Sequence, residues 1–428
     1  MPSRRSFIQK LGAVVGGTAF GTVSTVLSPQ MLKAAERVAT WKPQEVASDE
    51  AFWYEVRQAF TTSPNLINLN NGGVSPSPRV VQEAVESYNR LSNEAPTYYM
   101  WRVLDANREA LRMNLARLAG CLPEELAINR NSSESLETII FGLPLQRGDE
   151  VVLTKQDYPN MIQAWKQRVL RDGIVLKWVD LDLPTEDDKY VLEKFEEQFT
   201  EKTKLVQITH MINWTGQILP ARKIANMAHK RGIEVLVDAA HSFAQINFKI
   251  PDLDADYLGT SLHKWLCAPF GSGLLYVRKP LIKKIWPLFG AVEPEGEDIK
   301  KFEHLGTRSI AIEQAIGHAI NFHDFIGAER KEARLRFLKN YWAEKVAQMP
   351  RVKLLTSLKP QYSCALAMFA IEGKEPSEVD QFLFNKYKIH TVAITWENIK
   401  GVRVTPHLYT SLADLDRLVT GIEALTKS

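Results

Sequence analysis

A single lysine, Lys264, stands in the otherwise small, apolar or aromatic stretch TSLHKWLCAPFGSG (Thr260–Gly273). Burying an ammonium group without a partner is costly or lowers its pKa. The side chain is therefore either a surface lysine whose ammonium group reaches solvent or an amine held close to neutrality for chemistry. A neutral lysine amine attacks carbonyl carbons, so this stretch is a candidate for a covalent site.

A second candidate site is the start of a predicted helix within INRNSSESLETIIFGL (Ile128–Leu143). Its apolar residues recur at the spacing of an amphipathic helix. Asn131 and Glu134 form a close variant of a capping box, and Ser132 and Ser133 place hydroxyls beside the free amides of the first turn. Those amides suit a phosphate group, although ordinary capping explains the same residues.

Further polar side chains follow three β-rich runs. Asp238 and His241 occur in VLVDAAHS, His210 and Asn213 follow LVQIT, and Tyr158 follows EVVLTK. Ligands of open α/β sheets bind at the carboxyl ends of the strands. A carboxylate at such a strand end could pair with a cationic ring nitrogen, and a tyrosine ring could stack on a planar ligand. Taken singly, the carboxylate is also explained as an ordinary cap, and a lone tyrosine or histidine is better explained as a packed or surface side chain.

Together these clusters match the needs of one cofactor. Pyridoxal phosphate requires a lysine for a Schiff base, a carboxylate for its pyridinium nitrogen, a phosphate cup and an aromatic ring to stack on. Lys264, Asp238, the serine-rich helix start and Tyr158 would supply them. No G-x-G-x-x-G follows a predicted strand after about residue 40, and there is no Walker A motif, which disfavours a nicotinamide enzyme.

The elements that must position these residues alternate along the chain. From about Glu125, β-rich runs such as EVVLTK and KLVQITH precede segments of helical period such as NMIQAWKQRVLRDG and PARKIANMAHKRG. This alternation predicts an α/β fold with a mostly parallel central sheet and helices on both faces. After about Pro287, two helical stretches, two short strands and a last helix predict a smaller α+β domain.

The order of the serine-rich helix start, the tyrosine, the asparagine, VDAAH and SLHKW resembles the class V aminotransferases, which are fold-type-I pyridoxal-phosphate enzymes. The isopenicillin N epimerase-like subgroup, related to cysteine desulfurases and selenocysteine lyases, is most similar. The resemblance runs from LINLNNGGVSPSP (Leu66–Pro78) to VRVTPHLYT (Val402–Thr410). It implies an enzyme that acts at the α-carbon of an amino acid or amino-acid-containing substrate, through a Schiff base on Lys264 and a quinonoid intermediate.

The resemblance also implies a role for each matching residue. Lys264 would hold the cofactor and move the substrate proton, Asp238 would pair with the pyridinium nitrogen, and Arg403 would hold the substrate α-carboxylate. The other cofactor-binding residues would be the stacking Tyr158, the ring-side Asn213 and His241, the phosphate-binding Ser132, Ser133, Ser261 and His263, and Thr307 of GTRS, which would act across a subunit interface. Such enzymes are typically homodimers.

Two features depart from the family pattern. Cysteine desulfurases carry a nucleophilic cysteine shortly before the arginine strand, and YKIHTVAITWENIKGVRV (Tyr387–Val404) has none. Cys267 and Cys364 read as packed side chains, which disfavours persulfide chemistry. Relatives often have asparagine where Thr410 stands, so the sequence does not decide whether this residue contacts the substrate. Transamination, epimerisation and elimination are not separated, and a C–S lyase or a non-catalytic exported protein that keeps the fold are the alternatives.

Composition narrows the function classes. The chain has 428 residues and 45% hydrophobic content, enough for a sizeable core and two domains. Its 53 basic and 50 acidic residues leave a net charge of +3. The sequence contains no stripe of basic and aromatic residues, so nothing in it indicates nucleic-acid binding. The three cysteines lack the spacing of zinc ligands, so we expect no metal site.

The N-terminal stretch predicts export. SRRSFIQK (Ser3–Lys10) precedes the charge-free run LGAVVGGTAFGTVSTVLS (Leu11–Ser28), and the pair Arg4–Arg5 resembles a twin-arginine signal. The alternative is an amphipathic or membrane-anchoring helix, but the glycines and hydroxyl residues of the run argue against a permanent membrane span. We therefore expect delivery by the twin-arginine machinery to the periplasm. The expected organisation is a signal peptide (1–39), an N-terminal segment (40–75), a large pyridoxal-phosphate-binding domain (76–290) and a smaller C-terminal domain (291–428).

Overall fold

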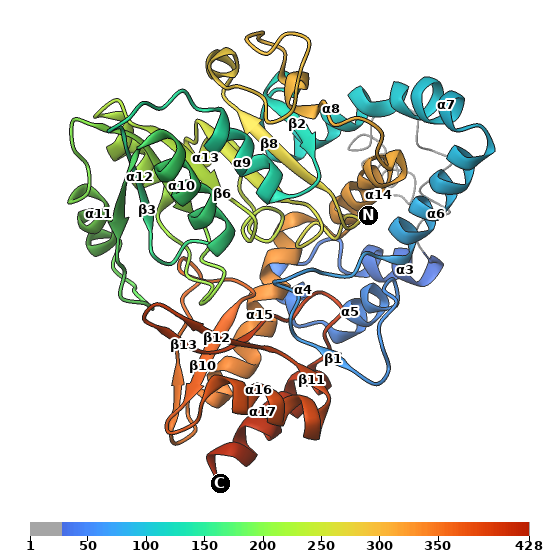
Figure 1. The fold of residues 1–428 in the computed structure, drawn as a ribbon. Helices are drawn as coiled ribbons and strands as arrows, with labels where there is room; N and C mark the ends of the chain where they lie inside the picture. Colours follow the sequence, from blue (N-terminus) through green and yellow to red (C-terminus); the bar gives the residue numbers. More distant parts are fainter. Residues whose placement is uncertain (1–27, 428) are drawn as a thin grey trace.

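The structure is a computed structural model that describes residues 28–427. The predicted twin-arginine motif and residues 11–27 of the run behind it lie outside the described residues. Among the helices that the structure describes, none is long and apolar enough to cross a membrane. Figure 1 shows the larger α/β part above, the C-terminal part below, and the N-terminal helices α3 to α5 against the junction of the two.

A seven-stranded sheet in the order β2-β8-β7-β6-β5-β3-β4 forms the centre of the larger part. The strands are β2 (Leu126–Asn129), β3 (Glu150–Thr154), β4 (Val175–Val179), β5 (Thr203–Thr209), β6 (Glu234–Asp238), β7 (Tyr257–Ser261) and β8 (Gly273–Val277). Strands β4, β3, β5, β6 and β7 pair in parallel, whereas β8 runs antiparallel to both β7 and β2. The predicted mostly parallel sheet is confirmed.

Helices cover both faces of this sheet, as the continuous apolar strands require. Alternate residues of β3 pack into different hydrophobic cores. Val152 packs against the helices on one face of the sheet, and Val151 and Leu153 pack against the helices on the other face. The first core includes residues of α8 (Arg108–Ala119), α12 (Ala221–His229) and α14 (Ile310–Ile326). The second includes residues of α9 (Ser132–Gly142) and α10 (Pro159–Asp172).

Shorter or peripheral helical segments complete the larger part. They are α6 (Arg79–Glu94), α7 (Pro96–Tyr98), η1 (Tyr99–Leu104), η2 (Asp105–Asn107), η3 (Pro123–Glu125), α11 (Asp188–Glu196), α13 (Ile250–Leu253), η4 (Lys279–Lys284) and η5 (Ile299–Glu303). Helix α14 packs along α6, so the segment after Pro287 also contributes to this part of the fold. The predicted domain boundaries stay a prediction.

The C-terminal part is a four-stranded antiparallel sheet in the order β12-β13-β10-β9. Its strands are β9 (Val352–Leu354), β10 (Ala367–Ile371), β12 (Val392–Trp396) and β13 (Ile399–Val404). Helices α15 (Ala328–Val346), α16 (Pro376–Tyr387) and α17 (Leu412–Thr426) pack against it around an apolar core. The two-residue strands β1 (Ile67–Asn68) and β11 (Ile389–His390) pair in parallel and tie the N-terminal segment to this part.

Three short helices precede β1 and are packed into the fold: α3 (Pro29–Arg37), α4 (Pro43–Ala47) and α5 (Glu50–Arg57). Met31 and Val38 are buried in a cluster that also contains Phe322 of α14. The Arg330 guanidinium donates hydrogen bonds to the carbonyls of Val38 and Ala39, at 3.3 and 3.2 Å. Residues 29–39, which the sequence assigned to the signal peptide, therefore have packing partners in the folded chain.

This packing carries a stability prediction. We expect a chain that begins at Thr40 to have an unfolding free energy about 3 kcal/mol lower than that of a chain that begins at Ser28. The loss follows from the apolar area that Met31, Ala34 and Ala35 of α3 and the following Val38 bury. Urea unfolding followed by circular dichroism measures both chains. Equal midpoints would show that α3 does not stabilise the fold.

Candidate active site

A cavity of about 220 Å³ lies at the carboxyl edge of the central sheet. The ends of β5, β6 and β7, the start of α9 and the loops that follow β3 and β5 all reach it. Every predicted cofactor-binding residue except Thr307 lines it, because parallel strands present their ends at one edge. The lining residues are Gly73, Asn131, Ser132, Ser133, Tyr158, Thr209, Asn213, Asp238, Ala240, His241, Ser261, His263 and Lys264.

Lys264 lies in the turn between β7 and β8, with its amine among polar side chains of the cavity. Its Nζ is 3.2 Å from Nε2 of His241. Burial lowers the Lys264 pKa to about 8, and the charge of Arg403 adds to this while Asp238 opposes it. Burial and the charges of Lys264 and Arg403 hold the His241 pKa well below its ordinary value, so this ring is neutral and its Nε2 accepts from the amine. Lys264 is therefore a lysine at the cavity whose amine has a lowered pKa, rather than a surface lysine whose ammonium group reaches solvent.

Asp238 is the carboxylate at the end of β6, with 5% of its surface exposed. Its Oδ1 accepts a hydrogen bond from the Ala240 N–H at 2.9 Å. Burial raises the Asp238 pKa, whereas this N–H and the charge of Lys264 lower it. A cation placed against such a carboxylate stabilises its ionised form, and the carboxylate in turn favours protonation of the partner.

The N-terminus of α9 forms a group of donors suited to an anion. Asn131 caps the helix by accepting from the Glu134 N–H at 2.9 Å. The Ser132 N–H donates to Ser261 Oγ at 2.9 Å, and that hydroxyl lies 3.0 Å from Ser132 Oγ. A Cβ at Gly273 would lie 2.6 Å from the Asn131 nitrogen, so glycine lets β8 approach the start of the helix. The predicted capping box is half formed, because the Glu134 carboxylate accepts from the Arg130 N–H instead.

Several buried polar atoms of the lining have no hydrogen-bond partner among the described residues. They are Oδ1 of Asn213 and the Nδ1 atoms of His241 and His263. Burial and the charge of Lys264 lower the His263 pKa to about 4, so this ring is neutral at physiological pH. Tyr158, the residue before α10, is 41% exposed. An aromatic face and unpaired polar atoms around one cavity are suited to a planar, polar ligand.

Arg403, on β13, reaches the cavity region from the C-terminal part. It is 7% exposed. Its Nη1 donates to the Asn213 carbonyl at 2.8 Å and its Nη2 to Asn70 Oδ1 at 3.0 Å, both uncharged acceptors. Burial lowers the Arg403 pKa to about 10, so the guanidinium remains charged at neutral pH. A buried guanidinium whose protein acceptors are neutral suits a ligand carboxylate.

A second, open cleft of about 570 Å³ adjoins the cavity at Gly73. Asn68, Asn70, His390 and Tyr409 are among its walls. Thr410, the position where the family pattern is broken, lines neither space. Its Oγ1 accepts from the His407 N–H at 2.9 Å and so closes a turn.

Some singled-out residues lie elsewhere. Thr307 is exposed in the loop between η5 and α14 and does not line the cavity of its own chain. His210 is buried against Phe248 and does not line the cavity. Cys267 and Cys364 are fully buried, with thiol pKa values raised by burial to about 11 and 12. Cys364 lies just before β10 rather than inside a strand.

Sequence reasoning missed Thr209 and Gly73 in the lining and Asn70 beside Arg403. Thr209 ends β5, so the strand-end argument that selected Asp238 could have found it. Asn70 and Gly73 lie within the stretch used for the family resemblance, but no chemical property marked them. Backbone contacts between distant segments bring them to the site: β1 pairs with β11, and Asn70 forms a parallel bridge with Thr405.

The residues present fit pyridoxal phosphate. Lys264 offers an amine with a lowered pKa, Asp238 a buried carboxylate with a single backbone donor, and the start of α9 an anion site. The unpaired atoms of Asn213, His241 and His263 are the donors and acceptors that a substituted pyridine ring needs. When bound, this cofactor supplies an electron-withdrawing ring that stabilises negative charge at the α-carbon of an amine substrate.

Comparison with known proteins agrees with this geometry. The family described as "Aminotransferase class-V" matches residues 67–418. Isopenicillin N epimerase of Streptomyces clavuligerus is 27% identical over 88% of this chain and 99% of its own. A probable cysteine desulfurase of Synechocystis sp. is 31% identical over 73% of this chain and 78% of its own.

Solved structures show the same fold. The apo structure of cysteine desulfurase from Thermococcus onnurineus NA1 aligns with a TM-score of 0.77 at 24% identity, over 87% of this chain and 98% of that chain. A K223A mutant of C-DES, with glycine covalently linked to its PLP cofactor, aligns with a TM-score of 0.76 at 22% identity, over 86% of this chain and 98% of that one.

Proposed function

Since the chain belongs to the class V aminotransferase family of pyridoxal-phosphate enzymes, we propose that it removes and returns a proton at the α-carbon of an amino acid or amino-acid-containing compound. The observation that carries the proposal is the Lys264 amine, whose pKa is lowered to about 8 within the cavity that Asp238 also lines. An amine of this pKa is partly neutral at physiological pH and can accept a proton.

The chain's own residues divide the work. Arg403 binds the substrate carboxylate and, through its bonds to Asn213 and Asn70, fixes where the α-carbon lies. The neutral His241 ring holds the Lys264 amine by accepting its hydrogen bond. The Lys264 amine then removes the proton from the α-carbon and delivers it to the atom that is protonated next. The cleft beside Gly73 gives room for the rest of the substrate.

We propose transamination or epimerisation rather than desulfuration through a protein persulfide. A persulfide needs a thiolate that reaches the substrate, because the thiolate is the nucleophile. Cys267 and Cys364 are buried, and Cys121 has its pKa raised by burial and by the charge of Glu125. No cysteine lines the cavity or the adjoining cleft.

A panel of amino acids tests the reaction type. The purified protein loaded with pyridoxal phosphate is assayed for keto-acid formation with an acceptor, loss of optical activity and sulfide release. We expect keto-acid formation or loss of optical activity with at least one amino acid of the panel. Sulfide release from the amino acid cysteine that persists in a variant without cysteine side chains would place the reaction among eliminations. Loss of this sulfide release in that variant would overturn the proposal.

Arg403→Lys is expected to raise KM for the amino-acid substrate about 30-fold, because lysine cannot bind a carboxylate in a bidentate fork. The change in kcat is expected to be smaller. Steady-state kinetics measure both constants. Lys400→Gln on the same strand is the matched control, because Lys400 is exposed and pairs with Glu375 at 2.9 Å. Equal effects of the two substitutions would remove Arg403 from the substrate site.

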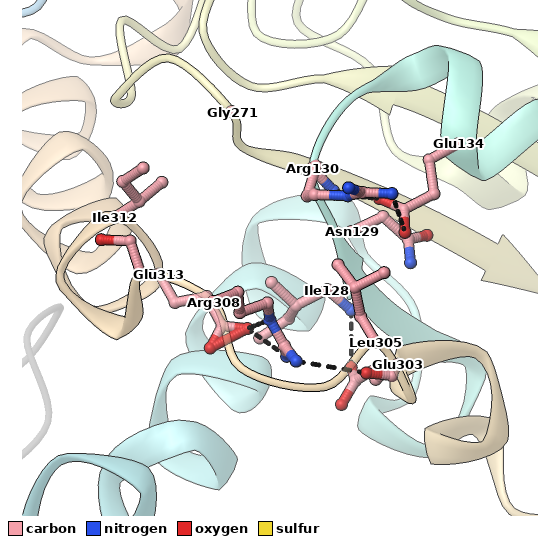
Figure 2. Close-up of a pocket in the computed structure, with 11 residues that line it drawn as sticks. Ile128, Asn129, Arg130, Glu134, Gly271, Glu303, Leu305, Arg308, Ile312 and Glu313 are labelled. Atoms are coloured by element: carbon pink, nitrogen blue, oxygen red, sulfur yellow. Dashed lines mark hydrogen bonds and ion pairs between the residues drawn. The ribbon is translucent and has the colours of Figure 1, made fainter. Parts of the chain in front are cut away.

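We further propose that the protein acts as a homodimer. Thr307 is exposed, and the hollow beside its loop has charged walls, seen in Figure 2, where Arg308 pairs with Glu313 at 2.7 Å and Arg130 with Glu134 at 3.1 Å. Arg130 directly precedes Asn131 at the start of α9. A two-fold related copy could therefore bring its own Thr307 loop to this phosphate-binding helix start.

We expect the interface to cover exposed aromatic side chains such as that of Trp101 on η1. Trp101 and the nearby Tyr98 and Tyr99 line neither the cavity nor the cleft. Light scattering on the active protein is expected to give twice the chain mass of 48.5 kDa. An active monomer would contradict the proposal.

Export through the twin-arginine machinery is a separate proposal, supported by Arg4–Arg5 and the run that follows. Replacing both residues by lysine is expected to leave the protein in the cytoplasm, because the machinery reads the arginine pair. Cell fractionation and immunoblotting measure the distribution. The control is the same substitution at Arg90 and Arg417, two exposed arginines far along the chain. Unchanged export of the Arg4→Lys, Arg5→Lys protein would rule out this route.

A further inference from the structure

Asp157 is a buried carboxylate beside the cavity that no residue pattern singled out. It lies between Thr154, the last residue of β3, and Tyr158, and it has no exposed surface. Burial and the charge of Asp238 raise the Asp157 pKa to about 6, while its hydrogen-bond donors lower it. An acid held inside a protein in contact with uncharged donors is uncommon, and such groups cluster at functional sites.

Three uncharged donors hold this carboxylate. Its Oδ1 accepts from the hydroxyls of Thr154 and Thr209, both at 2.7 Å. Its Oδ2 accepts from the Gln207 amide at 3.0 Å, and the Gln207 carbonyl in turn accepts from the Trp165 indole at 2.8 Å. These bonds favour the ionised form, since each donor stabilises negative charge. With a pKa of about 6, the Asp157 carboxyl is mostly ionised at neutral pH, inside the edge of the sheet.

Thr209 connects this charge to the cofactor cavity. It lines the cavity and stands opposite Asp238 in the register of β5 and β6. A hydroxyl has one hydrogen, and that of Thr209 is donated to Asp157. Toward the cavity the hydroxyl can therefore only accept a hydrogen bond. Asp157 thus sets the polarity of a group next to the carboxylate that would pair with the ring nitrogen.

We propose that Asp157 is a positioning residue of the cofactor site, which orients Thr209 as an acceptor and adds a second negative charge near Asp238, so that bound pyridoxal phosphate keeps its positive charge to a higher pH. The inference rests on the proposed function, because it concerns the cofactor of that site. It assigns Asp157 no contact with the substrate.

The test follows the pH dependence of the visible absorbance of the cofactor bound through Lys264. In the loaded Asp157→Asn protein, the midpoint of this titration is expected to fall by about half a unit to one unit, because removal of a nearby negative charge disfavours the protonated form. A purely structural role of Asp157 would lower the unfolding temperature and leave the midpoint unchanged. That result would overturn the proposal.

Two matched variants keep the test decisive if Asp157→Asn does not fold. Thr209→Val and Thr154→Val each remove one hydroxyl that donates to the same Oδ1 at 2.7 Å, but only Thr209 lines the cavity. We expect the midpoint to move in Thr209→Val and to stay within about 0.2 units in Thr154→Val. Equal midpoints in the two variants would overturn the proposal. A wild-type protein without visible absorbance after addition of pyridoxal phosphate would instead contradict the proposed function.

Discussion

Lys264→Ala is expected to lower kcat by roughly four orders of magnitude and to abolish the visible absorbance of the loaded protein. Both effects have one cause, because Lys264 supplies the only amine that lines the cavity in the described chain. Absorbance spectra and turnover of the best substrate in the panel measure the two effects. A small primary amine added to the solution is expected to restore part of the turnover, since it can carry the proton in the space that alanine leaves.

Lys279→Ala is the control for this substitution, because Lys279 is an exposed lysine just beyond the other end of β8. It is expected to leave absorbance and kcat unchanged. The pH dependence of cofactor uptake gives a second check. With a pKa of about 8, the Lys264 amine is about one-tenth neutral at pH 7, so uptake is expected to rise tenfold per unit below pH 8 and to level off above it. A rise that continues above pH 10 would show an ordinary lysine.

The site was predictable to the extent that it depends on strand ends. Asp238, Ser261 and Lys264 each follow an apolar run in the sequence, and a parallel sheet brings the ends of such runs together whatever the strand order. The chemical types of these residues then limited the ligand. For this reason Asp238, His241, His263 and Lys264 are found in one cavity, as expected.

Contacts that depend on register or on side-chain choice were not predictable. Glu134 has the spacing of a capping box, but its carboxylate accepts hydrogen bonds from the N–H and the guanidinium of Arg130 instead. Asp157 was not singled out, because nothing in the sequence shows that Thr209 and Gln207 of β5 face it. The packing of α3 against α14 joins segments almost three hundred residues apart, beyond the range of any local pattern.

Asp238→Asn is expected to lower kcat by about a thousandfold while the visible absorbance is retained, because Lys264 still holds the cofactor. Asparagine keeps the shape and can still accept from the Ala240 N–H, so the loss isolates the negative charge. Without that charge the ring nitrogen of the bound cofactor would be protonated less often, and the ring would withdraw less electron density from the α-carbon. Turnover and absorbance spectra of the variant measure the two properties separately.

The apoprotein should respond in the opposite direction. Burial raises the Asp238 pKa, so the folded apoprotein binds this proton more tightly than the unfolded chain, and the ionised carboxylate destabilises the fold as pH rises through its folded pKa. Asp238→Asn is therefore expected to unfold at an equal or higher urea concentration at pH 7. Asp256→Asn is the matched control: Asp256 is also 5% exposed, but it precedes β7 and pairs with His229 at 2.9 Å and Arg278 at 3.2 Å. That variant is expected to lose stability and keep kcat, and a thousandfold loss of kcat in both would show that neither carboxylate acts through the cofactor.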